Sequence, residues 1–261
     1  MNLLLKDHVI VITGGSAGIG RASAIALGGE GCRLAVGARD ASRLNELENE
    51  LSAASVDVVT RAGDLVDSAA LDELVGAAKD SYGRVDGLVA CVGSTPLGDF
   101  EQLDDAMWQR AFDMKFMATV RAIRAVLPVM LSSGGGRIVI LSGNTAQDPV
   151  HWMATSSAIN SALGSLAGSL ARQYGRRGVG INCVSPGPTR TARYQGMRKA
   201  VMEREGIPGE EADAYVADQI PDGRLTEPEE VASLVAYLLS PLGRHVNGAT
   251  FVMDGGQTWP R

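Results

Sequence analysis

HVIVITGGSAGIG, residues 8–20, joins a buried strand to a helix through a glycine-rich turn. Residues 8–13 form a β-branched run, which is typical of a parallel strand covered on both faces. Glycines in the turn that follows let the chain bend tightly and let a pyrophosphate approach the free N–H groups of the helix start. The stretch predicts a dinucleotide cradle, with a ligand-free turn as the alternative. The expected contacts in this turn are Gly14, Ser16, Ala17, Gly18, Ile19 and Gly20.

Strands and helices alternate along the rest of the chain. Further strands are expected at 33–38, 56–61 and 87–91, from Arg137, at 178–184 and at 250–253. Helices are expected at 68–81 and 104–131, in the small-residue stretch that ends at Tyr174, and at 227–239. This alternation predicts a Rossmann-type α/β fold, a doubly wound sheet of seven parallel strands. We predict a single domain over residues 1–261, with an irregular, mobile substrate lid at about 190–221.

The composition favours a globular chain without a nucleic-acid or membrane partner. Hydrophobic residues make up 45% of the sequence and charged residues 21%, which is enough for a sizeable core. The net charge of -6 disfavours binding to nucleic acid or to an anionic membrane. No apolar run is long enough to span a bilayer, and the apolar start is predicted to be a first strand and not a signal peptide. We therefore expect a cytoplasmic protein.

The chain has three cysteines, and each lies in a strand-like apolar run. Cys32, Cys91 and Cys183 are expected to be buried free thiols of a reducing compartment. None stands at metal-ligand spacing from a histidine, so the sequence predicts no metal site.

The end of the second predicted strand indicates which dinucleotide the cradle prefers. An acidic residue usually binds the adenosine ribose at this point, but here Ala38 is followed by Arg39. A guanidinium suits a 2′-phosphate, and Arg43, one helical turn on, offers a second donor. Asp40 adds a negative charge beside these two arginines. The alternative to a role in cofactor binding is that both arginines are solvated at the start of a helix. We predict NADP(H) as the preferred cofactor and NAD(H) as the second option.

Further cofactor contacts are expected where other strands end. Asp64 follows the third strand and is expected either to bind the adenine amino group or to cap the next helix. A small residue at the end of the fourth strand permits close approach of the cofactor. The segment SPGPTRT, residues 185–191, forms a rigid turn at the carboxyl end of the sixth strand, where ligands bind in open α/β sheets. The predicted contacts are Asp64, Leu65, Gly93, Asn160, Pro186, Gly187 and Thr189.

With these motifs in view, the chain resembles the classical short-chain dehydrogenase/reductase family over essentially its full length. The matching segments are TGGSAGIG (13–20), LVACVG (88–93), INCVSPGPTRT (181–191), PDGRLTEPEEVA (221–232) and MDGG (253–256), together with Asp64. Each is weak alone, but the set is specific. The resemblance implies a nicotinamide cofactor, a small carbonyl or alcohol substrate, and a homodimer or homotetramer built on two long helices per subunit.

The catalytic positions implied by the resemblance carry other residues in this chain. Anchoring on GRIVILSG and NSALGSLAGSLARQ places the family's serine at Gly143, its tyrosine at Ser156 and its lysine at Asn160. The family's asparagine falls on Lys115, in the segment WQRAFDMK. No shift of one residue restores the set, because positions 83–173 hold no tyrosine.

These replacements affect proton delivery. Reduction of a carbonyl by hydride requires a proton for the forming alkoxide, and the family's phenol supplies it because a nearby ammonium lowers its pKa from about 10. The hydroxyl of Ser156 is a far weaker acid, and Asn160 has no charge with which to tune it. Losing positioned acid–base catalysis costs about 10²–10⁴-fold in rate. Ketone reduction by the family's route is therefore expected to be very slow.

The remaining candidate catalytic residues are His151, Lys115, Ser156 and Asn160. Lys115 is expected either to act as acid or base with a pKa lowered by burial, or to reach solvent. His151, in the loop after Asp148, is an alternative general acid, although loop histidines are usually solvated. Ser156 and Asn160 lie one helical turn apart and face the same way, so Asn160 can still bind the nicotinamide ribose.

Three functions follow from these residues. The first is an NADP(H)-dependent oxidoreductase that acts on a small molecule with a non-standard proton donor. The second is an inactive NADP(H)-binding partner or redox-state sensor. The third is a lyase, isomerase or hydrolase that uses the same pocket without hydride transfer. The identity of the substrate cannot be read from the residues.

Overall fold

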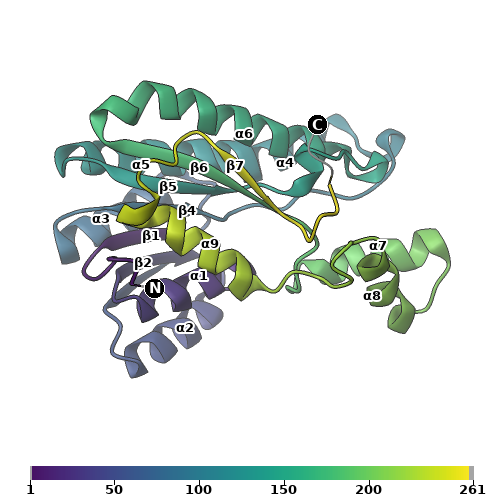
Figure 1. The fold of residues 1–261 in the computed structure, drawn as a ribbon, viewed down its shortest axis with the longest axis horizontal. Helices are drawn as coiled ribbons and strands as arrows, with labels where there is room; N and C mark the ends of the chain where they lie inside the picture. Colours follow the sequence, from purple (N-terminus) through teal and green to yellow (C-terminus); the bar gives the residue numbers. More distant parts are fainter. Residues whose placement is uncertain (1, 259–261) are drawn as a thin grey trace.

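A seven-stranded parallel sheet in the order β3-β2-β1-β4-β5-β6-β7 forms the centre of the molecule (Figure 1). The structure, a computed structural model, describes residues 2–258. The strands are β1 Val9–Thr13, β2 Arg33–Ala38, β3 Val58–Ala62, β4 Gly87–Ala90, β5 Gly136–Leu141, β6 Val179–Pro186 and β7 Thr250–Met253. The strand order reverses between β1 and β4, which confirms the predicted doubly wound sheet.

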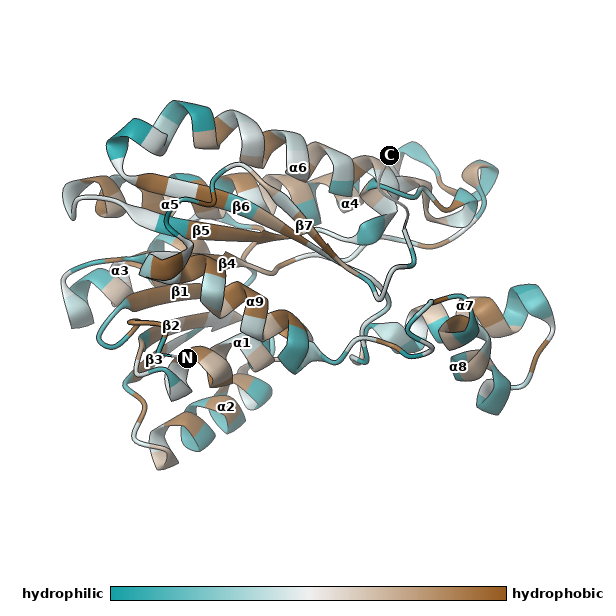
Figure 2. Ribbon diagram, in the orientation of Figure 1, coloured by the Kyte–Doolittle hydropathy of each residue, from teal (hydrophilic) through white to brown (hydrophobic). Residues whose placement is uncertain are grey.

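Helices cover both faces of this sheet and bury two separate apolar cores (Figures 1 and 2). Helices α3, α5 and α6 pack on one face, and α1, α2 and α9 pack on the other. The helices are α1 Gly18–Gly29, α2 Ala41–Ala53, α3 Ser68–Tyr82, α4 Asp105–Ala111, α5 Ala118–Ser132, α6 Ala154–Tyr174, α7 Tyr194–Glu205, α8 Gly209–Asp218 and α9 Pro228–Leu239. The two-sided cover explains why the central strands β1 and β4 are mostly apolar and fully buried.

The first strand shows how the sequence pattern sets the register. Val9 and Val11 face the core under α3, α5 and α6, whereas Ile10 and Ile12 face the core under α1, α2 and α9. Side chains alternate across a strand, so a β-branched residue at every position fills both cores. Each of these four residues is at most 1% exposed. The glycine turn after Thr13 therefore begins at a fixed point on the sheet edge.

The helix expected over residues 104–131 is interrupted by a wider turn. Helix α4 passes into a π-helical turn, Phe112–Met117, and then into α5. Single π-helical turns inside α-helices change the direction of the side chains they carry and occur frequently at functional sites. Here the turn carries Lys115, which is buried.

The lid is helical, and the expectation of an irregular segment there was wrong. Helices α7 and α8 project beside the sheet (Figure 1). Their charged composition obscures a few apolar residues that share one small core with Trp152 and Leu225. The helical residues in that core include Tyr194, Val201 and Val216. Sparse apolar residues are enough to order two short helices because a ready-made apolar surface meets them.

Strand ends differ from the expectations by one or two residues at several points. β3 begins at Val58, two residues later than expected, because Ser55 has a left-handed backbone (φ 61) after α2. β6 continues to Pro186, two residues beyond the predicted end, because its last residues pair with β7. Within residues 2–258, each helix is either too short or too polar to cross a lipid bilayer.

Candidate active site

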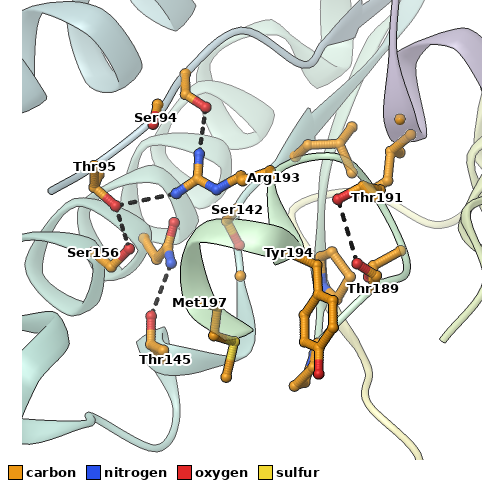
Figure 3. Close-up of a pocket in the computed structure, with 18 of the residues that line it drawn as sticks. Ser94, Thr95, Ser142, Thr145, Ser156, Thr189, Thr191, Arg193, Tyr194 and Met197 are labelled. Carbon is orange, nitrogen blue, oxygen red and sulfur yellow. Dashed lines mark hydrogen bonds between the residues drawn. The ribbon is translucent and has the colours of Figure 1, made fainter. Parts of the chain in front are cut away.

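A cavity of about 580 Å³ lies where the carboxyl ends of several strands meet. It is reached by the segments that follow β1, β4, β5 and β6, and the start of α7 closes one side. Figure 3 shows the guanidinium of Arg193 bonded to Thr95, which lies next to Ser156, and shows Thr189 and Thr191 on the other side of the view. The carboxyl edge of a doubly wound sheet at its switch point is where such folds bind ligands. This cavity is therefore the candidate active site.

The turn after β1 is shaped for a phosphate group. Gly14 has φ +72, and a Cβ atom there would lie 2.9 Å from the carbonyl oxygen of Cys91. Gly18 has φ +52, a conformation that side chains rarely adopt. The N-cap residue of α1, Ala17, makes no side-chain capping bond, and the first turn holds no acidic residue. The N–H groups of this helix start therefore remain available to an anion.

Not all six predicted residues of this turn reach the cavity. Gly14, Ala17, Gly18 and Ile19 line it, whereas Ser16 and Gly20 do not. Gly20 is buried beneath the turn, where the backbone of Gly14 leaves no room for a Cβ atom. A glycine at position 20 therefore allows β1 and α1 to pack closely.

Arg39 stands directly after β2 and is exposed. It forms no ion pair with a carboxylate of residues 2–258. Arg43, the second expected donor, is paired with Asp40: Nε lies 3.4 Å from Oδ2. Asp40 also accepts a hydrogen bond from the Arg43 backbone N–H at 3.1 Å and so caps α2. Asp40 thus engages Arg43 and leaves Arg39 as the freer guanidinium at this strand end.

Asp64 and Leu65 lie outside the cavity, at the end of β3. The Asp64 carboxylate accepts a hydrogen bond from the backbone N–H of Val66 at 3.2 Å. It does not cap the next helix, because the N-cap of α3 is Asp67, which accepts from the Ala69 N–H at 3.0 Å. Leu65 is buried. Of the two roles expected for Asp64, only contact with an adenine remains.

Lys115 and Asn160 meet at the floor of the cavity. Nζ of Lys115 donates to Oδ1 of Asn160 at 2.5 Å and to the carbonyl oxygen of Ser142 at 3.2 Å. Asn160 in turn donates from Nδ2 to Oγ1 of Thr145 at 2.9 Å. A Cβ atom at Gly143 would lie 2.7 Å from that same Nδ2. Three of the four positions implied by the family resemblance are therefore in contact.

Lys115 is 6% exposed, and the hydrogen-bond partners of its Nζ among residues 2–258 are neutral oxygens. Burial removes the ammonium from water and lowers the pKa of Lys115 from 10.5 to about 7, and the positive charge of Arg193 adds to this effect. Of the two outcomes expected for Lys115, burial and not solvent exposure is observed. The backbone permits this because Gly93, at φ +140, passes directly over the Lys115 side chain.

The second polar group of the cavity joins Ser156, Thr95 and Arg193. Oγ of Ser156 and Oγ1 of Thr95 are 2.6 Å apart, and Nη2 of Arg193 donates to the same Thr95 oxygen at 3.2 Å. Nη1 of Arg193 donates to the carbonyl oxygen of Gly93 at 2.6 Å. The three side chains point toward one another in Figure 3. The hydroxyl of Ser156 is therefore held in place from the lid side.

The turn after β6 supplies the opposite wall. Pro186, Gly187 and Thr189 all line the cavity, as expected. A Cβ atom at Gly187 would lie 2.7 Å from Cβ of Asp254, so the chain passes too close to β7 for any larger residue. Thr189 is held by a parallel bridge to Thr226.

The structure separates His151 from this site and adds residues that the sequence did not single out. His151 is exposed and is not among the residues that line the cavity, although Asp148 is. Thr95 had carried no functional expectation, and Arg193 was one of four lid cations, with Arg198, Lys199 and Arg204, that were expected either to attract an anion or to be exposed helix charge. Arg193 was hidden in a segment expected to be irregular, and a lone threonine after a strand gives no signal. The thiol of Cys91 lies at the cavity, and burial raises its pKa to about 11, which makes it unreactive.

Known proteins resemble the chain along its whole length. Residues 14–258 match the family described as Enoyl-(Acyl carrier protein) reductase. The uncharacterized oxidoreductase YvaG of Bacillus subtilis is 31% identical over 98% of both chains. The 2-(S)-hydroxypropyl-CoM dehydrogenase 3 of Xanthobacter autotrophicus is 32% identical over 99% of both chains. The L-sorbose reductase of Gluconobacter frateurii, solved with NADPH and L-sorbose, superposes with a TM-score of 0.94 at 28% identity over 100% of both chains.

The fold, the glycine turn and these similarities agree. The strand order is that of the doubly wound sheet, and the cavity lies at its switch point. The chain belongs to the short-chain dehydrogenase/reductase family of NAD(P)-dependent oxidoreductases.

Proposed function

We propose that the protein is an NADP(H)-dependent reductase of a small carbonyl compound, in which Lys115 replaces the family's tyrosine as proton donor. The observation that carries this proposal is the buried ammonium of Lys115, which lines the cavity and is bonded only to neutral oxygens. Its pKa of about 7 makes it a far stronger acid than the hydroxyl of Ser156. A group with a pKa near neutrality both gives up and regains a proton readily.

The cofactor, when bound, supplies a hydride to the carbonyl carbon. As that bond forms, negative charge develops on the carbonyl oxygen, and Lys115 transfers one proton from Nζ to it. The product is an alcohol, and the neutral amine then takes a proton from solvent. Two of the ammonium N–H groups are engaged by Asn160 and Ser142, which leaves one for the substrate oxygen.

Ser156 and Asn160 take supporting roles in this proposal. The Ser156 hydroxyl, fixed by Thr95, is oriented to donate a hydrogen bond to the substrate oxygen. The Asn160 amide holds the Lys115 ammonium in place and lies on the helix face that would meet the nicotinamide ribose. Neither side chain changes its charge during the reaction.

The preference for NADP(H) is part of the proposal. Arg39 has a guanidinium that no carboxylate of residues 2–258 engages, at the strand end where the adenosine ribose is expected. The similar L-sorbose reductase was solved with NADPH. A homodimer or homotetramer is likewise proposed from the family, and light scattering of the purified protein tests it.

One observation favours a second function, an NADP(H)-binding protein without turnover. Every buried side-chain nitrogen and oxygen of residues 2–258 has a hydrogen-bond partner, including those of Ser156, Thr95 and Asn160. A polar network that satisfies itself does not require a substrate. Tight NADPH binding with no turnover would support this reading.

Incubation with NADPH that carries deuterium at C4, and with a panel of ketones, aldehydes and imines, separates the two functions. We expect deuterium in an alcohol product and a loss of about 10²–10⁴-fold in kcat for Lys115→Met, with the Kd for NADPH little changed. Lys199→Met is the matched control, because Lys199 is an exposed lid lysine paired with Glu203. Equal kcat values in the native protein and Lys115→Met would contradict the proposal.

A further inference from the structure

Two cations face the cavity without a carboxylate partner. The guanidinium of Arg193 is bonded to the carbonyl oxygen of Gly93 and the hydroxyl of Thr95, and Lys115 is bonded to an amide and a carbonyl oxygen. Neither side chain forms an ion pair with any carboxylate of residues 2–258. Most other lid arginines do so: Arg198 pairs with Asp213 at 3.2 Å and Arg204 with Asp99 at 2.6 Å.

Arg193 has donors to spare. A guanidinium carries more N–H groups than the two acceptors here engage, and its flat fork matches a carboxylate with two parallel hydrogen bonds. The residue as a whole is exposed, yet protein surrounds the charged group closely enough that desolvation lowers the pKa of Arg193. The charge is therefore partly removed from water without being neutralised.

The charge within the cavity is unbalanced. Asp148 is the one acidic residue of the described chain that lines it, and Asp148 is exposed and pairs with neither cation. Arg193 and Lys115 also act on one another, since the charge of Arg193 helps to lower the pKa of Lys115. A bound anion would relieve this repulsion.

The rest of the cavity suits an apolar body. Leu97, Val150, Met153 and Met197 line it on the lid side. The phosphates of a dinucleotide have other partners on this chain, the uncapped start of α1 and the exposed Arg39, although the start of α1 also meets Thr191 just before α7. The Arg193 guanidinium is instead bonded to Gly93 and Thr95, next to Ser156, so we assign an anion at Arg193 to the second reactant.

We propose that Arg193 binds the carboxylate of the substrate, so that the protein reduces small oxo acids with an apolar chain. This inference rests on the proposed function and names the substrate class. Arg193 also holds Thr95, which holds Ser156, so the carboxylate sits beside the hydroxyl that faces the carbonyl oxygen. Lys115, whose side chain lies against Gly93, lines the same cavity and would donate its proton to that carbonyl oxygen.

The test is a binding experiment that needs no turnover. Isothermal titration of the NADP⁺-loaded protein, which has no hydride to transfer, compares acetoacetate, levulinate and 4-methyl-2-oxopentanoate with their methyl esters. We expect at least one acid to bind about 10- to 100-fold more tightly than its ester. That preference is expected to vanish in Arg193→Gln, which keeps amide donors for Gly93 and Thr95, and to persist in the control Lys199→Met.

Each outcome decides the point. Equal affinity for every acid and its ester, or an unchanged preference in Arg193→Gln, overturns the inference. A loss of NADPH affinity in Arg193→Gln instead assigns this arginine to the cofactor and also overturns it. If dihydroxyacetone phosphate, compared with dihydroxyacetone, shows a larger preference than any acid pair, the carboxylate assignment is wrong.

The two proposals fail separately in this design. A carboxylate preference without deuterium transfer supports the carboxylate site at Arg193 and contradicts the proposed reductase activity. Deuterium transfer to neutral ketones with no carboxylate preference supports the reductase and contradicts the carboxylate site at Arg193. A circular dichroism melt of Arg193→Gln, with Arg193→Lys beside it, shows whether any loss comes from unfolding of the lid.

Discussion

Nζ of Lys115 lies 2.5 Å from Oδ1 of Asn160. The resemblance implies an asparagine at position 115 and a lysine at position 160, and this chain has the reverse. The cavity holds one ammonium and one amide, and the ammonium comes from the π-helical turn before α5. We propose that the two residues are transposed relative to the family pattern and compensate for one another.

The transposition predicts strong coupling between the two positions. Asn160→Lys alone places a second ammonium against the first, and we expect it to destabilise the fold by about 3–5 kcal/mol. The double variant Lys115→Asn with Asn160→Lys is expected to regain most of that stability. Urea unfolding of both single variants and the double variant measures the coupling energy. Additive losses of unfolding free energy would show that the Lys115–Asn160 contact contributes no coupling energy.

The lowered pKa of Lys115 predicts a pH dependence of both rate and stability. Reduction requires the ammonium form, so kcat is expected to fall as the pH rises through about 7. Between about 7 and 10.5 the unfolded chain holds a proton on Lys115 that the folded chain does not. The free energy of unfolding attributable to this residue therefore rises with pH across that window. Denaturation at several pH values should show a slope that Lys115→Met removes.

Arg39 predicts the cofactor preference. Arg39→Asp should weaken NADPH binding by about tenfold or more, because a bidentate partner for the 2′-phosphate is lost and a like charge is introduced. Binding of NADH should change little or improve. Fluorescence titration with both cofactors measures this, and Arg43→Asp serves as the comparison, since Arg43 is engaged by Asp40. Equal losses for NADPH and NADH would remove Arg39 from the cofactor site.

Gly143 predicts a steric link to Asn160. Its φ of 173° is ordinary extended backbone, so a side chain there causes no backbone strain. A Cβ atom would lie 2.7 Å from Asn160 Nδ2 and would disturb its bond to Thr145. We expect Gly143→Ser to cost about 1 kcal/mol and the cost to disappear when Asn160 is alanine. Thermal melts of the two single variants and the double variant check this.

The central strands were predictable because they are buried on both faces. β2 and β7 have the predicted bounds, and every residue of β1 is apolar or β-branched. A continuous apolar run that is bounded by glycine turns predicts a buried strand. The glycine turn likewise predicted where the cavity lies, since a parallel sheet places all its carboxyl ends at one edge.

The lid and the fine structure of the site were not predictable in the same way. The α7–α8 region presents few apolar residues among many charges, and its order depends on Trp152, a residue distant in the sequence. The pairing of Arg193 with Gly93 and Thr95 joins residues about a hundred positions apart, which no local pattern encodes. The burial of Lys115 depends on the π-helical turn and on Gly93, neither of which changes the hydrophobic periodicity.

Helices α7 and α8 share a small core with Trp152, and we expect this core to make the lid unfold as a separate cooperative unit. Two arginines tie α7 back to the body of the protein: Arg204 lies over the Trp152 ring at 5.4 Å and pairs with Asp99, and Arg193, at the start of α7, donates to Gly93 and Thr95. Segments with few buried contacts open locally at lower free energy than a central sheet. The amide hydrogens of α7 and α8 should therefore exchange with solvent together and well before those of β1 and β4, so that substrate entry is gated by local unfolding instead of by a rigid hinge.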